Sequence, residues 1–311
     1  MPIGDHITSF ANRKVELFDP AVGITDPVGT ACALRVEWNE YDTDITKQLE
    51  QLLQDPEVDQ LEALVIGPWH QEMSQHSSSI AVNALVAAQE QLTSLKAVFV
   101  GEITYDEFEI SWILQSDISP LLAAYPNLEV LQVRGGTDLA FKSLHHEQLK
   151  TLIIETGGLS PNTIAQICAG HLPALEHLEL WLGSDEYGGN SSVDDLQPIL
   201  SGNLFPKLTY LGLCDSEYSD SIAKAIVQSP IIEQIEVLDL KLGTLGDEGA
   251  QALLNCPAVS RLNTLNVKEN YLSEEMIERL NQLNIEVIAD EQKEEDEEEE
   301  EEYRRYCSVT E

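Results

Sequence analysis

The sequence predicts an α/β solenoid in which short parallel strands alternate with helices along the chain. The clearest observation is the stretch 235–270, where two segments of the form Leu-x-x-Leu-x-Leu, at 235–240 and 262–267, flank a helical stretch at 246–254. Apolar and polar residues alternate within each segment, as in a strand with one buried face. One such unit cannot bury its apolar face alone, so neighbouring units must stack on it. This pattern is typical of a leucine-rich repeat.

The same strand pattern recurs along most of the chain, with a mean spacing of about 28 residues, which is the size of one strand plus one helix. Strands are expected to start at residues 31, 61, 95, 128, 149, 175, 208, 235, 262 and 285. The unit that starts at 128 is too short for a full helix and is expected to carry only a turn. The longer units carry insertions, clearest at 183–190. Residues 31–290 therefore form an irregular solenoid of about ten units.

Within one unit, the alternation assigns each side chain to a face. Leu238 and Leu240 are expected to point inward, whereas Val237, Asp239 and Lys241 point outward. The following helix is expected to open at 246–248, where two carboxylates lie near its positive end. Pro257 is expected to end it.

The two ends of the chain depart from the repeat. Residues 1–30 are broken by Asp-Pro and Gly turns around a short strand at 15–18, and we interpret them as an N-terminal cap. Ten of the twelve residues in 291–302 are acidic, which predicts a disordered tether. The segment 303–311 is again rich in aromatic and β-forming residues. It either returns to the body as an edge strand, with Tyr306 as its anchor and Arg304 and Arg305 against the acidic body, or stays free.

Residues 246–253, Gly-Asp-Glu-Gly-Ala-Gln-Ala-Leu, resemble the repeat of the ribonuclease-inhibitor-type leucine-rich-repeat proteins. The resemblance implies a horseshoe with parallel strands on the concave face and helices on the convex face. It also implies that Asn270 bonds the turn backbone of the adjacent repeat. The segments 18–20, 110–113 and 305–309 resemble a group of bacterial intracellular leucine-rich-repeat proteins, which implies a location and no activity.

The formal net charge is −38, of which residues 291–311 contribute −8 and the rest of the chain −30. An acidic surface repels phosphate backbones, so we expect no nucleic acid partner. A basic protein is the natural complement, although solubility alone also explains the charge.

The location is expected to be cytoplasmic. The start of the chain has no basic segment followed by an apolar core, and no apolar run approaches the length of a membrane-spanning helix, so we expect no membrane partner. The five cysteines lie far apart without a C-x-x-C pair, which favours reduced thiols.

The sequence predicts no enzyme, cofactor or metal site. The seven histidines form no zinc-binding spacing, and no phosphate-binding loop or nucleophile motif is present. The adjacent pair His145–His146 is interpreted as an exposed turn rather than a ligand pair.

The candidate binding surface is the outward strand face, centred on Trp181 and Tyr210, because outward aromatic residues on neighbouring strands anchor interfaces. The alternative is that the loop 183–190 or the tail folds over them. The full set of candidate partner-binding residues is Arg134, Glu155, His177, Glu179, Trp181, Tyr210, Asp239, Lys241, Asn266 and Lys268.

Two functions remain open at this point. The first is a non-catalytic protein–protein interaction module that binds a partner on its concave face. The second is a regulator of an enzyme, either a GTPase activator or an inhibitor of a basic enzyme. An acidic tail on a ribonuclease-inhibitor-type solenoid is similar in outline to the activator of the nuclear transport GTPase. A histone-binding role would rest on the tail alone.

Overall fold

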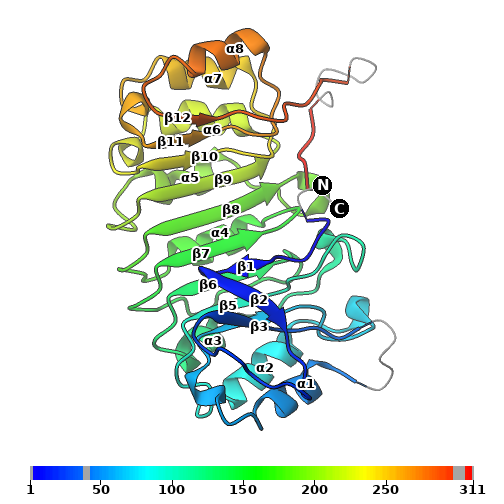
Figure 1. Ribbon diagram of the computed structural model, residues 1–311. Helices are drawn as coiled ribbons and strands as arrows, with labels where there is room; N and C mark the ends of the chain where they lie inside the picture. The colour runs from blue at the N-terminus through cyan, green and yellow to red at the C-terminus, as the bar shows by residue number, and fades with distance from the viewer. Residues whose placement is uncertain (1–2, 38–42, 297–304, 310–311) are drawn as a thin grey trace. The chain divides into compact units, whose positions relative to one another are not determined.

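The computed structural model describes residues 3–37, 43–296 and 305–309. It is an α/β fold with twelve strands in the described ranges, labelled β1 to β12 in chain order (Figure 1). Strands β2 to β6 pair with one another in parallel, as do β8 to β12, whereas β1 pairs with β2 in antiparallel fashion. The acidic residues 297–302 and the residues Tyr303 and Arg304 lie outside the described ranges.

The chain divides into two compact units. In the described ranges, the N-terminal unit comprises residues 3–154 and 169–174, and the C-terminal unit comprises residues 155–168 and 175–309.

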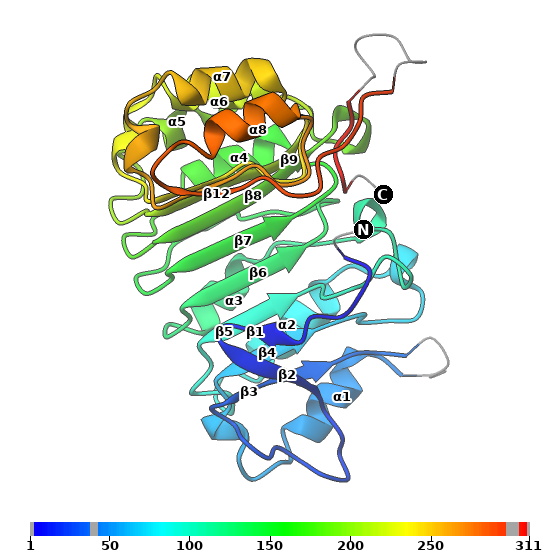
Figure 2. The ribbon, with the colours of Figure 1, turned by 45° about the horizontal axis from the view of Figure 1, so that its top comes forward.

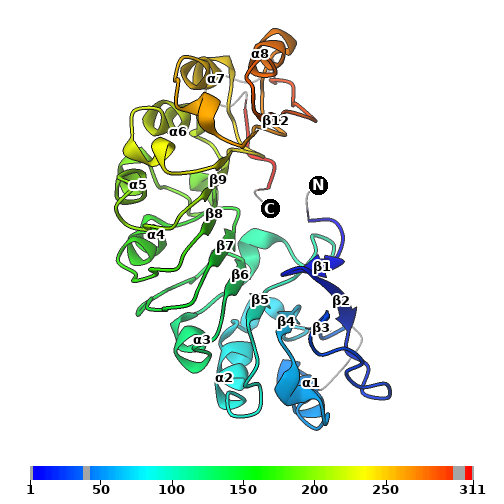
Figure 3. The ribbon, with the colours of Figure 1, turned by 60° about the vertical axis from the view of Figure 1, so that its left-hand side comes forward.

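The N-terminal unit contains three helices, which lie on one side of its strands (Figure 3). Its helices are α1 (Ile45–Leu52), α2 (Ser79–Ala87) and α3 (Ser119–Ala124). Its strands are β1 (Ser9–Phe10), β2 (Arg13–Leu17), β3 (Thr30–Leu34), β4 (Ala63–Ile66), β5 (Ala97–Val100), β6 (Val130–Arg134) and β7 (Thr151–Glu155), the last ending at the boundary.

The C-terminal unit has the same layering, with β8 to β12 side by side and its helices on one side of them (Figure 2). Its strands are β8 (His177–Gly183), β9 (Tyr210–Ser216), β10 (Val237–Asp239), β11 (Thr264–Asn266) and β12 (Glu286–Ile288). Its helices are α4 (Pro161–Cys168), α5 (Val193–Leu200), α6 (Ser219–Ile226), α7 (Asp247–Leu254) and α8 (Glu274–Leu280). We call the side of the strands away from the helices the strand face.

The predicted strand positions are confirmed, because a strand lies at each of the ten expected places. The repeat leucines form the core: Leu238 and Leu240 are fully buried, as the alternation predicts. Helix α7 begins at Asp247 and ends at Leu254, which matches the predicted helix. No helix lies in the described chain between β6 and β7, so the short unit carries only turns, as its length predicts.

Asn270 links two repeats in the way that the family resemblance implies. Its side chain is fully buried. Its Nδ2 donates to the carbonyl oxygen of Leu240 at 2.8 Å, and its Oδ1 accepts from the amide of Leu245 at 2.9 Å. Both partners belong to the preceding unit, so the side chain satisfies backbone groups that would otherwise be buried without a partner.

The N-terminal segment covers the strand face of the N-terminal unit. Strand β2 pairs with β3, and β1 and β2 form a hairpin (Figure 3). Phe10 on β1 lies 5.9 Å from Phe99 on β5, measured between ring centres. Beneath it lie small apolar residues of β3 to β5, such as Ala33 and Ala63, which leave room for the aromatic ring. This part of the strand face is therefore occupied by the chain itself.

A buried carboxylate ties the same segment down. Glu102 has no exposed surface and contacts His6 Nδ1 at 3.0 Å, the amide of Ile7 at 2.9 Å and Arg35 Nη2 at 2.7 Å. The hydrogen bond to Glu102 raises the pKa of His6 to about 9, helped by Glu107. The imidazole is therefore charged at neutral pH and compensates the buried carboxylate.

At the other end, residues 305–309 lie against the C-terminal unit. The amide of Ser308 donates to Leu242 O at 2.9 Å, and the amide of Val309 donates to Asp215 Oδ1 at 3.0 Å. Cys307 and Val309 are buried, whereas Tyr306 is 58% exposed. The anchoring side chains are therefore Cys307 and Val309 and not the predicted Tyr306, although Arg305 does reach Asp220 at 3.4 Å.

Candidate functional site

Six of the ten candidate residues come together on the strand face of the C-terminal unit. They form what we call the polar cluster, which consists of His177, Glu179 and Trp181 on β8, Tyr210 on β9, Asp239 on β10, and Lys241 just after β10. The register explains the grouping, because His177 pairs with Tyr210, and Tyr210 with Val237, two residues before Asp239.

Glu179 is the centre of one half of this cluster. Its Oε1 accepts from Trp181 Nε1 at 2.8 Å and lies 2.8 Å from Lys241 Nζ. The residue opposite it on β9 is Gly212, where a Cβ would lie only 2.9 Å from Glu179 Cγ. The missing side chain at Gly212 thus makes room for the carboxylate to lie over β9, where it reaches Lys241.

Asp239 is the centre of the other half. It accepts from the Tyr210 hydroxyl at 2.6 Å, from Lys241 Nζ at 3.0 Å and from the Lys241 amide at 3.0 Å. Only 1% of Asp239 is exposed. The prediction that Asp239 points outward is right for its direction but wrong for its exposure, because neighbouring side chains on the same face enclose it.

The electrostatics hold the Glu179 carboxylate and the Lys241 ammonium group in their charged forms. Burial raises the pKa of Glu179, but the contact with His177 and the charge and hydrogen bond of Lys241 outweigh burial and hold this pKa at about 2. Burial lowers the pKa of Lys241, but the negative charges of Glu179 and Asp239 outweigh burial and raise it. The cluster is therefore a fixed ionic network at neutral pH.

The aromatic members differ from the prediction. Trp181 is only 4% exposed, so it is a buried residue and not an exposed anchor. Tyr210 is half-buried, and its ring stacks on that of His177 with 3.7 Å between centres and an angle of 8°. The accessible aromatic surface is therefore the His177–Tyr210 pair.

The remaining four candidates have other contacts. Arg134 lies in the N-terminal unit, is buried, and donates to Ile103 O at 2.7 Å. Glu155 is also buried. Asn266 accepts from the amide of Lys268 at 3.1 Å, and Lys268 Nζ lies 3.0 Å from Glu291. Asn266 and Lys268 are half-buried, so they remain accessible in part.

A row of accessible side chains runs across five paired strands of the strand face. Each member occupies the same position in its unit, and the register places them side by side. We call this set the third-position row: His177, Tyr210, Val237, Thr264 and Glu286. The first four are half-buried and the last is exposed.

Two groups of potential metal ligands occur in the described part of the chain. The first, Glu179, Cys214 and Asp239, is buried, and the Lys241 ammonium already lies between its two carboxylates. Burial also raises the pKa of Cys214 well above its usual value, so the thiol is protonated. A cation would have to displace Lys241, which makes this group a poor metal site.

The second group, His145, Glu147 and His171, is exposed and lies within the N-terminal unit. The interpretation of His145–His146 as an exposed turn is wrong for His146, which is 3% exposed and contacts Tyr125 O at 3.0 Å. His145 instead lies beside His171. A signal was present in the sequence, because each lies four residues before the first leucine of its unit, Leu149 and Leu175.

The fold and its strand face define a class, an α/β repeat protein with consecutive parallel strands. Neither a family model nor a curated protein matches the chain. Among solved structures, a protein from Bacteroides fragilis is 30% identical with a TM-score of 0.79, and the match covers 89% of this chain and 76% of that one. This chain belongs to the same family as that protein.

A second solved structure, an internalin from Listeria monocytogenes, is 16% identical with a TM-score of 0.42. The match covers 82% of this chain and 60% of the internalin. A TM-score of this size does not establish a shared fold.

Proposed function

We propose that this chain is a leucine-rich-repeat protein of the ribonuclease-inhibitor-like type that binds a partner protein on the strand face of its C-terminal unit. The observation that carries the proposal is the third-position row. It offers half-buried and exposed side chains on five neighbouring strands, including the stacked pair His177 and Tyr210. Tyrosine is among the residues that dominate binding energy at interfaces.

The buried network behind this row supports the proposal. The Tyr210 hydroxyl donates to Asp239, which is itself held by Lys241. A side chain that is already fixed loses little conformational entropy when a partner binds, so its contacts contribute more to affinity. The N-terminal unit offers no equivalent row on β3 to β5, because its own N-terminal segment lies there.

The charge of the chain favours a basic partner over nucleic acid. The formal net charge is −38. The electric field of this charge speeds the encounter with a basic protein and repels phosphate groups. In the described ranges, no helix combines the length and apolarity that crossing a bilayer requires. A non-catalytic role and a cytoplasmic location belong to the same proposal and rest on the sequence.

The test compares matched variants in quantitative capture from native extract. Val237→Asp places a charge in the middle of the row, and Gln282→Asp makes the same type of change at an exposed position on the helix side. Proteins that bind through the row are retained by the wild type and by Gln282→Asp and are lost with Val237→Asp. Tyr210→Phe keeps the ring, so it should retain these proteins better than Tyr210→Ala.

The captured proteins should also be released as the salt concentration rises, because screening weakens the attraction between the acidic chain and a basic partner. Capture that is unchanged by both Val237→Asp and Tyr210→Ala would contradict the proposed surface. Both variants should show the wild-type circular dichroism spectrum, which separates lost binding from lost folding.

A further inference from the structure

The exposed group His145, Glu147 and His171 is built by the backbone of two successive units. The amide of His171 donates to Leu144 O at 2.8 Å, and the amide of His146 donates to His171 O at 3.0 Å, so the two loop segments form a parallel bridge at His145 and His171. The imidazole rings consequently stack, with 4.9 Å between centres and an angle of 19°. The backbone thus fixes two histidines side by side although they are far apart in sequence.

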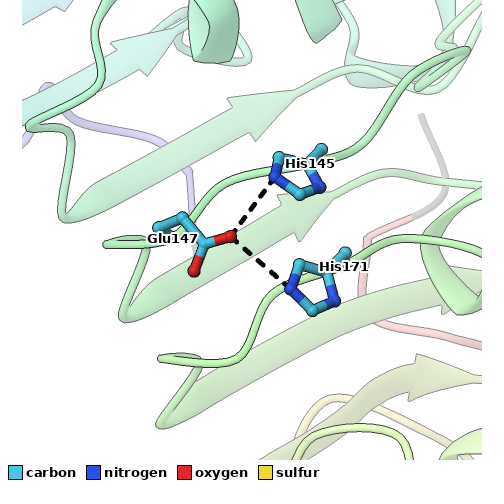
Figure 4. Close-up of side chains that lie close together, drawn as sticks. All are labelled: His145, Glu147 and His171. Atoms are coloured by element: carbon cyan, nitrogen blue, oxygen red, sulfur yellow. Dashed lines mark ion pairs between the residues drawn. The ribbon is translucent and has the colours of Figure 1, made fainter.

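Glu147 completes the group from the same side. Its Oε1 lies 3.3 Å from His145 Nε2 and 3.6 Å from His171 Nε2, so one carboxylate oxygen faces both rings (Figure 4). All three ligand atoms lie within 4.8 Å of one another. More than half of each side chain is exposed, so an ion from solution can reach them.

These distances fit a shared metal ion. Ligand atoms about 2.0–2.1 Å from a tetrahedral zinc ion are separated from each other by about 3.3–3.4 Å. The two nitrogen–oxygen distances are already close to this value. The remaining distance, between His145 Nε2 and His171 Nε2, is at most 4.8 Å. A small rotation of these exposed side chains shortens it to the same value.

We propose that His145 Nε2, His171 Nε2 and a Glu147 oxygen bind one divalent late transition-metal ion of the zinc type. Imidazole nitrogen favours zinc, copper and nickel, whereas magnesium and calcium prefer oxygen ligands. Two charged imidazolium rings stacked at this distance would repel each other, whereas two neutral rings sharing one cation do not. Three protein ligands leave a further coordination position for water or for a ligand from outside the chain.

The acidic character of the chain assists binding and also requires a control. A net charge of −38 raises the local concentration of any cation. Carboxylates elsewhere, above all in 291–302, would bind metal ions weakly and without preference for nitrogen. Millimolar magnesium in the buffer occupies such sites and leaves the histidine site free.

The experiment is a calorimetric titration of the tag-free full chain with Zn²⁺ and separately with Ni²⁺, in metal-free buffer that contains magnesium. The wild type is expected to bind one equivalent. His171→Ala and Glu147→Ala should each weaken this binding at least about tenfold, because each removes a ligand. Binding should also weaken from pH 7.5 to pH 5.5, because protons compete for imidazole nitrogen.

The matched control is His76→Ala. The rings of His70 and His76 also lie together, 3.7 Å apart between centres, but they are not part of either ligand group in the described ranges. This variant should keep the wild-type affinity. If His76→Ala loses the binding, or if His171→Ala and Glu147→Ala both keep it, the site is not the one proposed.

Cobalt provides a second readout, which reports the type of ligand atom. Co²⁺ bound by nitrogen and oxygen gives visible d–d bands, which should disappear in His171→Ala. A strong thiolate-to-cobalt charge-transfer band would assign the ion to a cysteine site and overturn the proposal. The exposed positions of the three side chains mean that each variant should keep the wild-type melting temperature in the absence of metal.

Discussion

Asp239 shows how a side chain on the strand face becomes part of the interior. Its carboxylate accepts from Tyr210 and twice from Lys241, and only 1% of the residue is exposed. Removing one partner of a buried charged network leaves the other groups without compensation. The stability of this face therefore depends on a polar residue as much as on the repeat leucines.

We predict that Asp239→Ala lowers the free energy of unfolding by about 3 kcal/mol. This is the low end of the range for a broken buried ion pair, because Lys241 retains its ion pair with Glu179. Leu238→Ala, in the core beside it, should lose about 2–5 kcal/mol. Glu236→Ala removes an exposed carboxylate from the same unit and should change stability by less than about 0.5 kcal/mol. Urea unfolding measures all three, and a similarly small effect of Asp239→Ala would contradict its burial.

At the scale of single residues, the sequence predicts the direction in which a side chain points better than its exposure to solvent. Period-two alternation determines which way Leu238 and Asp239 point, because it depends only on the strand itself. The burial of Trp181 depends on partners such as Glu179, whose position depends in turn on the absent side chain of Gly212 on the next strand. The pairing of His145 with His171 needs the register of two units, which their equal offsets before Leu149 and Leu175 could have indicated.

Among the elements, the positions of the repeat strands were predictable, whereas the contacts of the two terminal segments were not. Local periodicity predicts the strand of each unit and the helix of most units, and all ten strands occur where it places them. The N-terminal segment lies on β5 through Phe10 and Phe99, a contact between residues far apart in the chain that no local pattern encodes. The same holds for Val309 against Asp215.

The C-terminal segment is coupled to the protonation of Asp215. Burial raises the pKa of Asp215 well above its usual value, against the opposing effects of the Val309 amide and Lys293. A carboxyl group with a raised folded-state pKa contributes stability that is full below its unfolded pKa of about 3.9 and is lost as pH rises toward its folded pKa. Lys293, whose pKa burial lowers to about 8, and Glu269 are the charged groups that act on it.

We predict that Asp215→Asn raises the melting temperature at pH 7.5 and that this gain shrinks toward pH 4. Asparagine keeps the oxygen that accepts from Val309, removes the ionisable group, and tolerates the positive φ of 49° at this position. Glu217→Gln, at a carboxyl group only two residues away, serves as the control and should show a smaller pH dependence, because that residue is exposed. A gain that is equal at pH 4 and pH 7.5 would show that the ionisation of Asp215 does not act on stability.

For the whole molecule, the excess of acidic over basic residues dominates the electrostatics. With 55 acidic and 17 basic residues, exposed carboxylates repel one another over the surface, and this repulsion destabilises the compact state. The internal ion pairs act in the opposite direction. Glu179–Lys241 and Glu102–Arg35 are shielded from solvent on their acidic partner, so dissolved salt weakens them much less than it weakens the surface repulsion.

We therefore predict that the melting temperature rises as sodium chloride increases from about 0.01 M to about 0.5 M. The Debye length falls from about 30 Å at 0.01 M to about 10 Å at 0.1 M, which is the range over which repulsion between surface carboxylates is lost. Choline chloride at equal ionic strength should have the same effect, because screening does not depend on the cation. A rise with sodium alone would indicate specific ion binding, and a fall with both salts would mean that exposed ion pairs outweigh the repulsion of the acidic surface.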